Sequence, residues 1–232
     1  MADYSKIIKN ELFSNGADLV GIGSLAELPA DVRRALPVGV CVAVKLPKEI
    51  VRGIAALPTK EYYDQYYIIN KKLDSLVTLG AGLLKSYGFE AVAQTQDYVR
   101  QGQTGNKSLL PHKTVATRAG MGWIGKSALL VTKEFGSMVR ISSLLTDAPL
   151  EPAQPLDQAL CGSCTICTDA CPGAAVLGKQ WSVGVSREEL FDAAACQKTA
   201  KERALRGFGI ETTLCGKCIE VCPYTKRYLN QK

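Results

Sequence analysis

Two runs of cysteines decide how this chain is organised: Cys161-Gly-Ser-Cys164-Thr-Ile-Cys167-Thr-Asp-Ala-Cys171-Pro172 and Cys215-Gly-Lys-Cys218-Ile-Glu-Val-Cys222-Pro223. The first run has the spacing C-x2-C-x2-C-x3-C-P, and the second repeats the last three cysteines with the same spacing. Thiolates are soft, strongly donating ligands, and spacers of two or three residues let one turn of backbone bring several of them to one centre. The runs therefore predict metal centres built from cysteine.

The first spacing is typical of proteins that bind two 4Fe–4S clusters, in which three cysteines of a run hold one cluster and the fourth holds the other. The second run has three cysteines, and Cys196 is the only cysteine between the runs. We therefore assign one cluster to Cys161, Cys164, Cys167 and Cys222, and the other to Cys171, Cys196, Cys215 and Cys218. A pair of four-cysteine zinc sites is the alternative, since zinc also uses C-x2-C, but the repeated x3-C-P ending favours iron–sulfur.

Length and composition set the frame around these runs. A chain of 232 residues with 47% hydrophobic residues can form one large or two small domains with a real core. Residues 1–13 form a polar amphipathic pattern rather than a signal peptide, and no apolar run approaches the roughly 18 residues of a membrane span. We expect a cytoplasmic protein with no membrane partner. The formal charge of +6 falls as each thiolate-ligated cluster adds about −2, so it indicates a polyanionic partner only weakly.

The order of the expected elements indicates an α+β fold. Helices are predicted at residues 4–14, 29–36, 59–87 and 112–120, and strands at residues 17–23, 38–46, 90–95, 128–132 and 138–145. Gly102, Gly105 and Asn106 predict a loop over residues 97–111. Residues 151–155 read as a linker, so the predicted domains are an α/β domain at 1–150 and a cysteine-rich domain at 151–232. Cys41, in the apolar run 38–44, is predicted to be a buried core residue.

The long helix predicted at residues 59–87 begins with an unusual group of aromatic residues, Tyr62, Tyr63, Tyr66 and Tyr67. Tyrosines at this spacing usually pack a helix against a sheet. The alternative is that some of them line the pocket of a flat cofactor.

The segment Gly120–Ser127 matches two phosphate-binding patterns, G-x4-G-K-S and G-x-G-x2-G. Both patterns require a strand before the glycines and a helix after them. Here a predicted helix precedes and a predicted strand follows, and Trp123 would crowd a phosphate. ATP and dinucleotide binding are therefore minor alternatives to a glycine-rich loop that approaches another large ligand.

The sequences Arg118-Ala-Gly-Met-Gly-Trp-Ile-Gly-Lys126, Phe135-Gly-Ser137 and Leu145-Thr-Asp147, together with Ala17–Ile22 and the two cysteine runs, resemble epoxyqueuosine reductases. The resemblance covers nearly the whole chain. It implies a nitroreductase-like cobalamin-binding domain followed by a ferredoxin-like domain with two 4Fe–4S clusters, as in the similar reductive dehalogenases. The implied activity is a cobalamin-dependent reductase that removes oxygen, halide or a similar group from an organic substrate.

The resemblance also implies site residues and partners. The corrin would be cradled by Gly120, Gly122, Trp123, Gly125, Lys126, Ser127, Leu130 and Ile141. Electrons would come from an external donor of the ferredoxin or flavodoxin type and pass through the clusters to cobalt. The substrate would be a small molecule or a nucleoside. Because the chain ends ten residues after Cys222, it reads as a short variant without a C-terminal extension, which argues against tRNA.

The proton donor departs from the family pattern. The aspartate that serves these enzymes falls by count on Gln94, which has no acidic proton. His112, the only histidine, is the first alternative because its ordinary pKa is near neutrality and it precedes the glycine-rich segment. It could equally be a solvent-facing residue at a helix start. Asp97 is the second candidate and Tyr66 the third.

Two classes of function remain open. A cobalamin-dependent reductase explains the long segment before the cysteines, with its pocket-like features. A two-cluster electron carrier without substrate chemistry of its own is the alternative, although a carrier needs far less chain before the clusters.

Overall fold

The structure is a computed structural model that describes residues 3–101, 103–104 and 107–231. The chain forms two compact units, each made of several segments: residues 1–44, 69–121 and 140–156 form the first, and residues 45–68, 122–139 and 157–232 form the second. The sequence predicts two consecutive domains instead, 1–150 and 151–232. Within the described residues no helix is long and apolar enough to cross a membrane.

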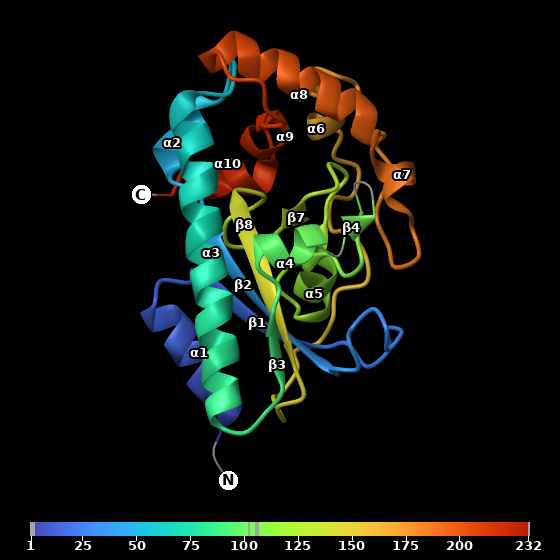
Figure 1. Cartoon of the computed structure of the whole chain (residues 1–232). Helices are drawn as coiled ribbons and strands as arrows, with labels where there is room; N and C mark the ends of the chain where they lie inside the picture. Colours follow the sequence, from blue (N-terminus) through green and yellow to red (C-terminus); the bar gives the residue numbers. More distant parts are fainter. Residues whose placement is uncertain (1–2, 102, 105–106, 232) are drawn as a thin grey trace. The chain divides into compact units, whose positions relative to one another are not determined.

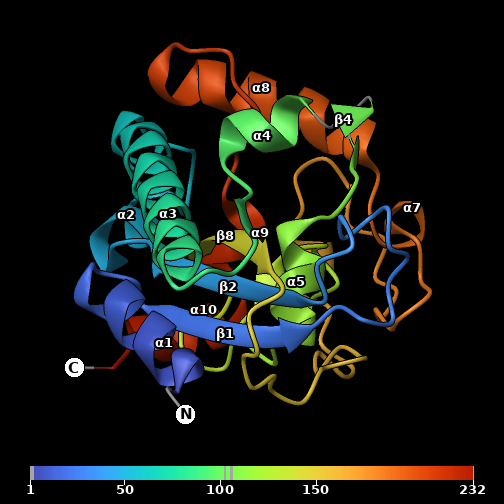
Figure 2. The ribbon, with the colours of Figure 1, turned by 60° about the horizontal axis from the view of Figure 1, so that its bottom comes forward.

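The first unit is built around a four-stranded sheet with the order β1-β2-β8-β3 (Figure 1). Its strands are β1 (Leu19–Ser24), β2 (Val38–Lys45), β3 (Ala91–Ala93) and β8 (Val139–Thr146). β1 pairs antiparallel with β2, as Figure 2 shows, and β3 pairs antiparallel with β8. The six central residues of β2 are all buried, which confirms the prediction of a strand covered on both faces and of Cys41 in the core.

Helices cover both faces of this sheet. On one face, Gly80 of α3 (Lys60–Ser86) packs against Leu144 of β8 and against Ile8 and Leu12 of α1 (Tyr4–Ser14). On the other face, α5 (His112–Arg118) lies so close to β1 that a Cβ on Gly23 would stand 2.5 Å from the Arg118 carbonyl carbon. The glycines of β1 therefore let α5 approach the strand.

Two predicted segments differ from the structure. Residues 29–36 form turns rather than a helix, because Arg34 and Ala35 both have left-handed backbone, with φ of 54° and 59°. The predicted loop at 97–111 contains α4 (Gln96–Gln101) and the short strands β4 (Gln103–Thr104) and β5 (Lys107–Ser108). The Asp74 carboxylate accepts the Gln96 backbone N–H at 2.9 Å, which fixes the start of α4. Gly102, Gly105 and Asn106 lie outside the described residues.

The second unit consists of short elements joined by irregular chain. They are α2 (Lys48–Gly53), β6 (Trp123–Ile124), β7 (Leu130–Val131), α6 (Ile166–Asp169), α7 (Arg187–Leu190), α8 (Ala193–Phe208), α9 (Lys217–Glu220) and α10 (Pro223–Leu229). β6 and β7 form an antiparallel hairpin. The hairpin follows α5 and precedes β8 in the chain. This order agrees with the predicted helix at residues 112–120 followed by strands at residues 128–132 and 138–145.

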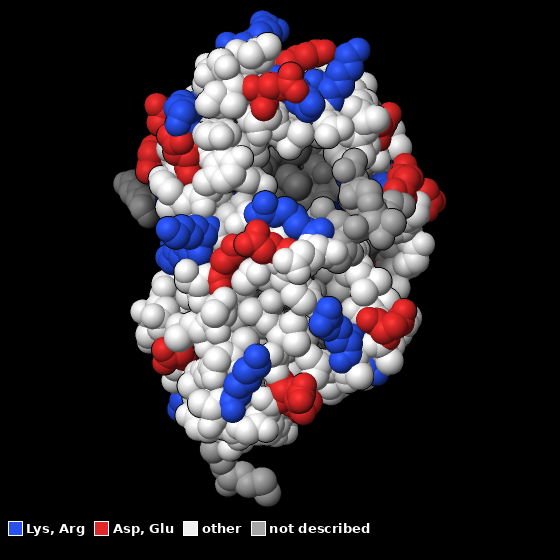
Figure 3. Space-filling model, viewed as in Figure 1, with Lys and Arg blue, Asp and Glu red and all other residues white. Residues whose placement is uncertain are grey.

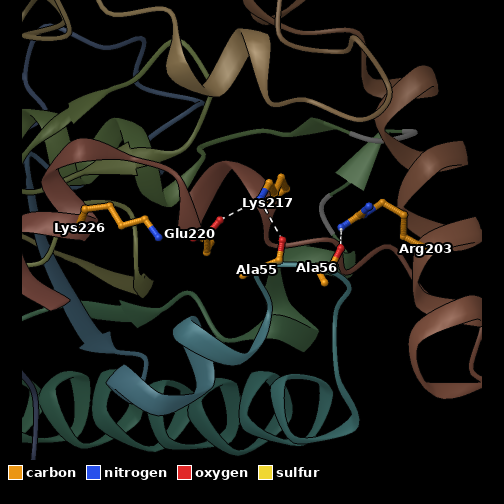
Figure 4. Close-up of polar contacts among 6 residues, drawn as sticks. All are labelled: Ala55, Ala56, Arg203, Lys217, Glu220 and Lys226. Atoms are coloured by element: carbon orange, nitrogen blue, oxygen red, sulfur yellow. Dashed lines mark hydrogen bonds and ion pairs between the residues drawn. The ribbon is translucent and has the colours of Figure 1, made fainter.

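Charged side chains tie the segment before α3 to the C-terminal helices (Figure 4). The Lys217 ammonium donates to the Ala55 carbonyl at 2.9 Å, and the Arg203 guanidinium donates to the Ala56 carbonyl at 2.6 Å. Burial alone would raise the pKa of Glu220, but hydrogen bonds from Lys226 and Lys217 lower it below its usual range. These contacts explain why residues 45–68 belong to the same unit as the cysteine runs.

Candidate functional site

The eight cysteines of the two runs and of α8 are partly buried, whereas Cys41 is fully buried. Cys167 lies in α6, Cys196 in the first turn of α8, and Cys218 in α9. Cys222 caps α10, and Pro223 starts that helix because its fixed φ suits the first helical position. Short helices thus present cysteines from distant parts of the sequence to the same region.

Five cysteines line one small cavity of about 140 Å³. They are Cys161, Cys164, Cys167, Cys218 and Cys222. Burial, followed by the neighbouring thiols of Cys161, Cys222 and Cys164, raises the pKa of Cys167 to about 11. The side chain of Cys167 is therefore surrounded by the three partners that the spacing assigns to it.

A second group of thiols surrounds Cys196. Burial, followed by the effects of Cys215 and Cys171, raises the pKa of Cys196 to about 11. Burial also raises the pKa of Cys218, followed by the effects of Cys215 and Cys196. The backbone N–H of Ala175 donates to the Cys171 sulfur at 3.3 Å.

Both groups have the chemistry that a 4Fe–4S cluster requires: four thiols in a partly buried setting, with N–H groups that hydrogen-bond to sulfur. Among the described residues, no three His, Cys, Asp or Glu side chains converge closely enough to hold a single metal ion.

The phosphate-like motif lies beside the first group of thiols. The Gly125 N–H donates to the Leu129 carbonyl at 2.8 Å, so it closes the β6–β7 hairpin and is not open to a phosphate. Gly125, Lys126 and Ser127 line the 140 Å³ cavity, and the Lys126 ammonium donates to the Cys164 carbonyl at 2.9 Å. The geometry thus gives no support to the ATP and dinucleotide alternatives.

The glycines predicted to approach a corrin approach the protein itself. A Cβ on Gly122 would stand 2.2 Å from the Val131 carbonyl oxygen, and one on Gly120 would stand 2.6 Å from the Gln154 carbonyl oxygen. Trp123 and Leu130 are buried, and Ile141 is partly buried. The absence of a side chain at Gly122 and Gly120 thus accommodates backbone of Val131 and Gln154, and contact of these glycines with a corrin stays a prediction.

The first unit contains a larger cavity of about 320 Å³. Its wall consists of Val32, Arg34, Gln94, Tyr98, Val99, Gln101, Ser108, Leu109, Leu110 and Leu145. The Arg34 guanidinium lies over the Tyr98 ring, 4.8 Å from its centroid. A flat cationic and aromatic pair at the rim of a mixed polar and apolar cavity suits a planar organic ligand.

Gln94 connects this cavity to His112. The Ser143 hydroxyl donates to Gln94 Oε1 at 2.6 Å, and Ser143 Oγ is 2.8 Å from His112 Nδ1. Because the single hydroxyl proton of Ser143 is used on Gln94, His112 Nδ1 donates to Ser143. Gln94 Nε2 has no hydrogen-bond partner among the described residues and remains available to a ligand.

The three candidate proton donors lie in different surroundings. Burial, assisted by Arg140, lowers the pKa of His112 to about 4, so the ring is neutral at pH 7. The Asp97 side chain is 82% exposed and pairs with Arg100 at 3.1 Å, and Asp97 is not among the residues that line the cavity. Tyr66 packs against the Tyr67 ring, with 5.3 Å between the ring centroids.

Arg34, Tyr98 and Ser143 were not predicted as site residues. Arg34 and Tyr98 carry no periodic signal and meet only in the folded chain. Ser142 and Ser143 did offer a signal, because two adjacent hydroxyl residues stand between the apolar residues Ile141 and Leu144 of the strand.

Residues 160–225 match the family described as "4Fe-4S double cluster binding domain". Epoxyqueuosine reductase of Lactococcus garvieae (strain Lg2) is 33% identical over 172 residues, which cover 70% of this chain and 42% of that protein. The chain thus spans less than half the length of this relative.

Two solved structures share the fold. One is epoxyqueuosine reductase with a tRNA-Tyr epoxyqueuosine-modified tRNA stem loop, with a TM-score of 0.62, 20% identity, and coverage of 95% of this chain and 65% of that chain. The other is a reductive dehalogenase described with a mechanism for B12-dependent dehalogenation, with a TM-score of 0.69, 18% identity, and coverage of 93% and 31%. The chain is therefore similar to epoxyqueuosine reductases, and its residues 160–225 match a double 4Fe–4S cluster binding domain.

Proposed function

We propose that this protein is an iron–sulfur reductase in which two 4Fe–4S clusters carry electrons, one at a time, toward an organic substrate. The observation that carries the proposal is the arrangement of eight cysteines in two groups of four, one of them around a 140 Å³ cavity. The ligand sets are those assigned from the spacing. A protein that only carried electrons would have no use for the 320 Å³ cavity of the first unit.

Cobalamin is the second cofactor of the proposal. Its support is the fold shared with a reductive dehalogenase described as B12-dependent and the similarity to epoxyqueuosine reductases. When bound, a reduced corrin supplies a strong nucleophile and reductant. The residues of the β6–β7 hairpin, Trp123 and Leu130 among them, are its proposed neighbours.

The 320 Å³ cavity is the proposed substrate site. Its volume is at the lower end of the range for small-molecule sites, which fits a nucleoside or a smaller molecule. The Gln94 amide would donate to the substrate, while Arg34 and Tyr98 would hold a planar group. His112 acts behind Gln94, through Ser143, as a positioning residue and not as the acid itself, because its ring is neutral.

An external one-electron carrier of the ferredoxin or flavodoxin type is the proposed donor. The formal charge of +6, reduced by about 2 for each bound cluster, favours an acidic partner only weakly, and lysine and arginine are interspersed with aspartate and glutamate on the face in Figure 3. An intact tRNA is not part of the proposal.

Metal analysis of anaerobically purified protein tests the cluster part. We expect about eight iron and eight sulfide per chain, as two cubane clusters require. Cys196→Ser should lose one cluster, and the buried Cys41→Ser is the matched control that should lose none. Zinc without acid-labile sulfide would contradict the proposal.

Absorbance and turnover measurements test the cobalamin and substrate parts of the proposal. Protein reconstituted with cobalamin should show corrin absorbance beyond the cluster shoulder and should reduce the epoxyqueuosine nucleoside or a halogenated aromatic compound. Intact clusters with neither corrin binding nor turnover would instead identify an electron carrier.

A further inference from the structure

Lys126 occupies an environment that is costly for a lysine. Its residue is 6% exposed, and its ammonium donates to the Cys164 carbonyl at 2.9 Å. Within the described part of the chain it has no carboxylate partner. A buried ammonium without a counter-charge costs several kcal/mol, so a negatively charged group is expected beside it.

The wall of the 140 Å³ cavity supplies the place for that negative charge. Lys126 lines this cavity together with Cys161, Cys164, Cys167 and Cys222. Four thiolates around a 2+ iron–sulfur core leave a net charge of about −2. The lysine of the phosphate-like motif therefore faces the site of a different anion.

Trp123 adds a second interaction on the same side. Its indole Nε1–H donates to the Cys161 sulfur at 3.4 Å, and the ring is fully buried. Hydrogen bonds to cluster sulfurs and nearby positive charge both stabilise the reduced form, because reduction adds one negative charge. Trp123 and Lys126 thus act in the same direction on one cluster.

The lysine beside the second group of thiols has a counter-charge. Lys217, which directly precedes Cys218, pairs with the Glu220 carboxylate at 3.0 Å, so its positive charge is compensated within the protein.

We propose that Lys126, assisted by Trp123, gives the cluster of Cys161, Cys164, Cys167 and Cys222 a higher reduction potential than the other cluster. One electron leaves the external carrier, which is oxidised by one electron, and settles on this cluster, whose net charge becomes one unit more negative. No bond is formed or broken and no proton moves. The inference rests on the ligand sets of the proposed function.

An anaerobic redox titration followed by electron paramagnetic resonance tests the proposal on the cluster-loaded protein. Lys126→Gln removes the charge and keeps a hydrogen-bond donor. The higher of the two midpoint potentials should fall by ~59 mV, which corresponds to a tenfold change in the one-electron reduction equilibrium. The lower midpoint potential should not change. Lys133→Gln, at an exposed lysine that follows β7, is the control and should change neither. Trp123→Phe should shift the same midpoint as Lys126→Gln.

Each result of the titration either supports or overturns the proposed role of Lys126. Two intact clusters with unchanged midpoints in Lys126→Gln would overturn the proposal, as would loss of the lower-potential signal in Cys222→Ser. If Lys126→Gln fails to hold the cluster, Lys126→Arg decides: a normal midpoint supports the role of charge, and a lowered one refutes it. Turnover is not measured, so a failure of the proposed substrate chemistry does not affect the result.

Discussion

The His112 ring lies between α5 and β8, and its surroundings decide its charge. Burial and Arg140 hold its pKa at about 4, below the usual value of 6.5, so the folded protein binds the proton less readily than the unfolded chain. As the only histidine it gives isolated NMR signals, which should not titrate between about pH 5.5 and 7.5. A midpoint near 6.5 would show that the ring is exposed to solvent.

The same pKa makes stability depend on pH. Between pH 6.5 and 4 the unfolded chain is protonated at His112 and the folded protein is not, so the free energy of unfolding falls as the pH falls, by at most about 3 kcal/mol. Urea unfolding should show a shallower decline in His112→Gln over this window. An identical decline would mean that carboxylates alone account for it.

Gln94 accepts the buried hydroxyl of Ser143, and its replacement should be costly even without substrate. Gln94→Met leaves the Ser143 hydroxyl without its acceptor, which should reduce the free energy of unfolding by about 1–2 kcal/mol. Gln101→Met, at an exposed residue of the same cavity wall, should change it by less than about 0.5 kcal/mol. Equal effects at the two positions would contradict the hydrogen-bond argument.

At the scale of elements, α3 contains two glycines in different surroundings. Gly82 faces open space, so Gly82→Ala should stabilise the protein by up to about 1 kcal/mol through helix propensity. A Cβ on Gly80 would stand 2.7 Å from Leu144 and 3.3 Å from Ile8, so Gly80→Ala should destabilise by about 1 kcal/mol. Thermal unfolding of both variants measures the difference, and similar melting temperatures would refute the packing of α3 on β8.

The elements that could be predicted are those in which the spacing of apolar residues along the sequence identifies a strand or a helix. The apolar run of β2 and the stripe along α3 predicted those elements to within about one residue at each end. The buried face of α3 changes after Gly80: Leu84 is buried, whereas Tyr87, seven residues after Gly80, is 44% exposed. A 27-residue helix does not keep a single face buried against a small sheet. The turns at residues 29–36 and helix α4 depend on contacts with other segments, which no local pattern records.

The β6–β7 hairpin shows why the candidate site was only partly predictable. Cysteine spacing is a local property, so the thiol groups could be assigned from sequence. The role of Gly122 could not, because the Val131 carbonyl that it accommodates comes from the facing strand. The pair of Arg34 and Tyr98 joins segments more than sixty residues apart in the chain.

At the scale of the whole molecule, the second unit has little structure that would persist without metal. Helices α6, α7 and α9 have four residues each, too few to be stable by themselves. Binding of a structural metal centre is then coupled to folding. Chelation of iron should therefore remove hydrogen-exchange protection from residues 157–232 while β2 keeps its protection.

Hydrogen exchange with mass spectrometry, before and after anaerobic chelation, measures this effect. Cys41→Ser serves as the control, because it should behave like the unchanged protein in both states. Unchanged protection of residues 157–232 after loss of iron would mean that side-chain packing, such as that of Trp181 and Leu190, is sufficient.

The crossed order of the cysteines has a consequence for how the protein is made. In the proposed assignment, one group is completed by Cys218 and the other by Cys222, although their first members, Cys171 and Cys161, are synthesised 47 and 61 residues earlier. A ribosome that has made residues 1–210 has thus synthesised five of these thiols, with neither set of four ligands complete. One set is complete only when residue 218 has been made and the other only when residue 222 has been made, so a chain truncated before residue 218 would lack a ligand of each cluster.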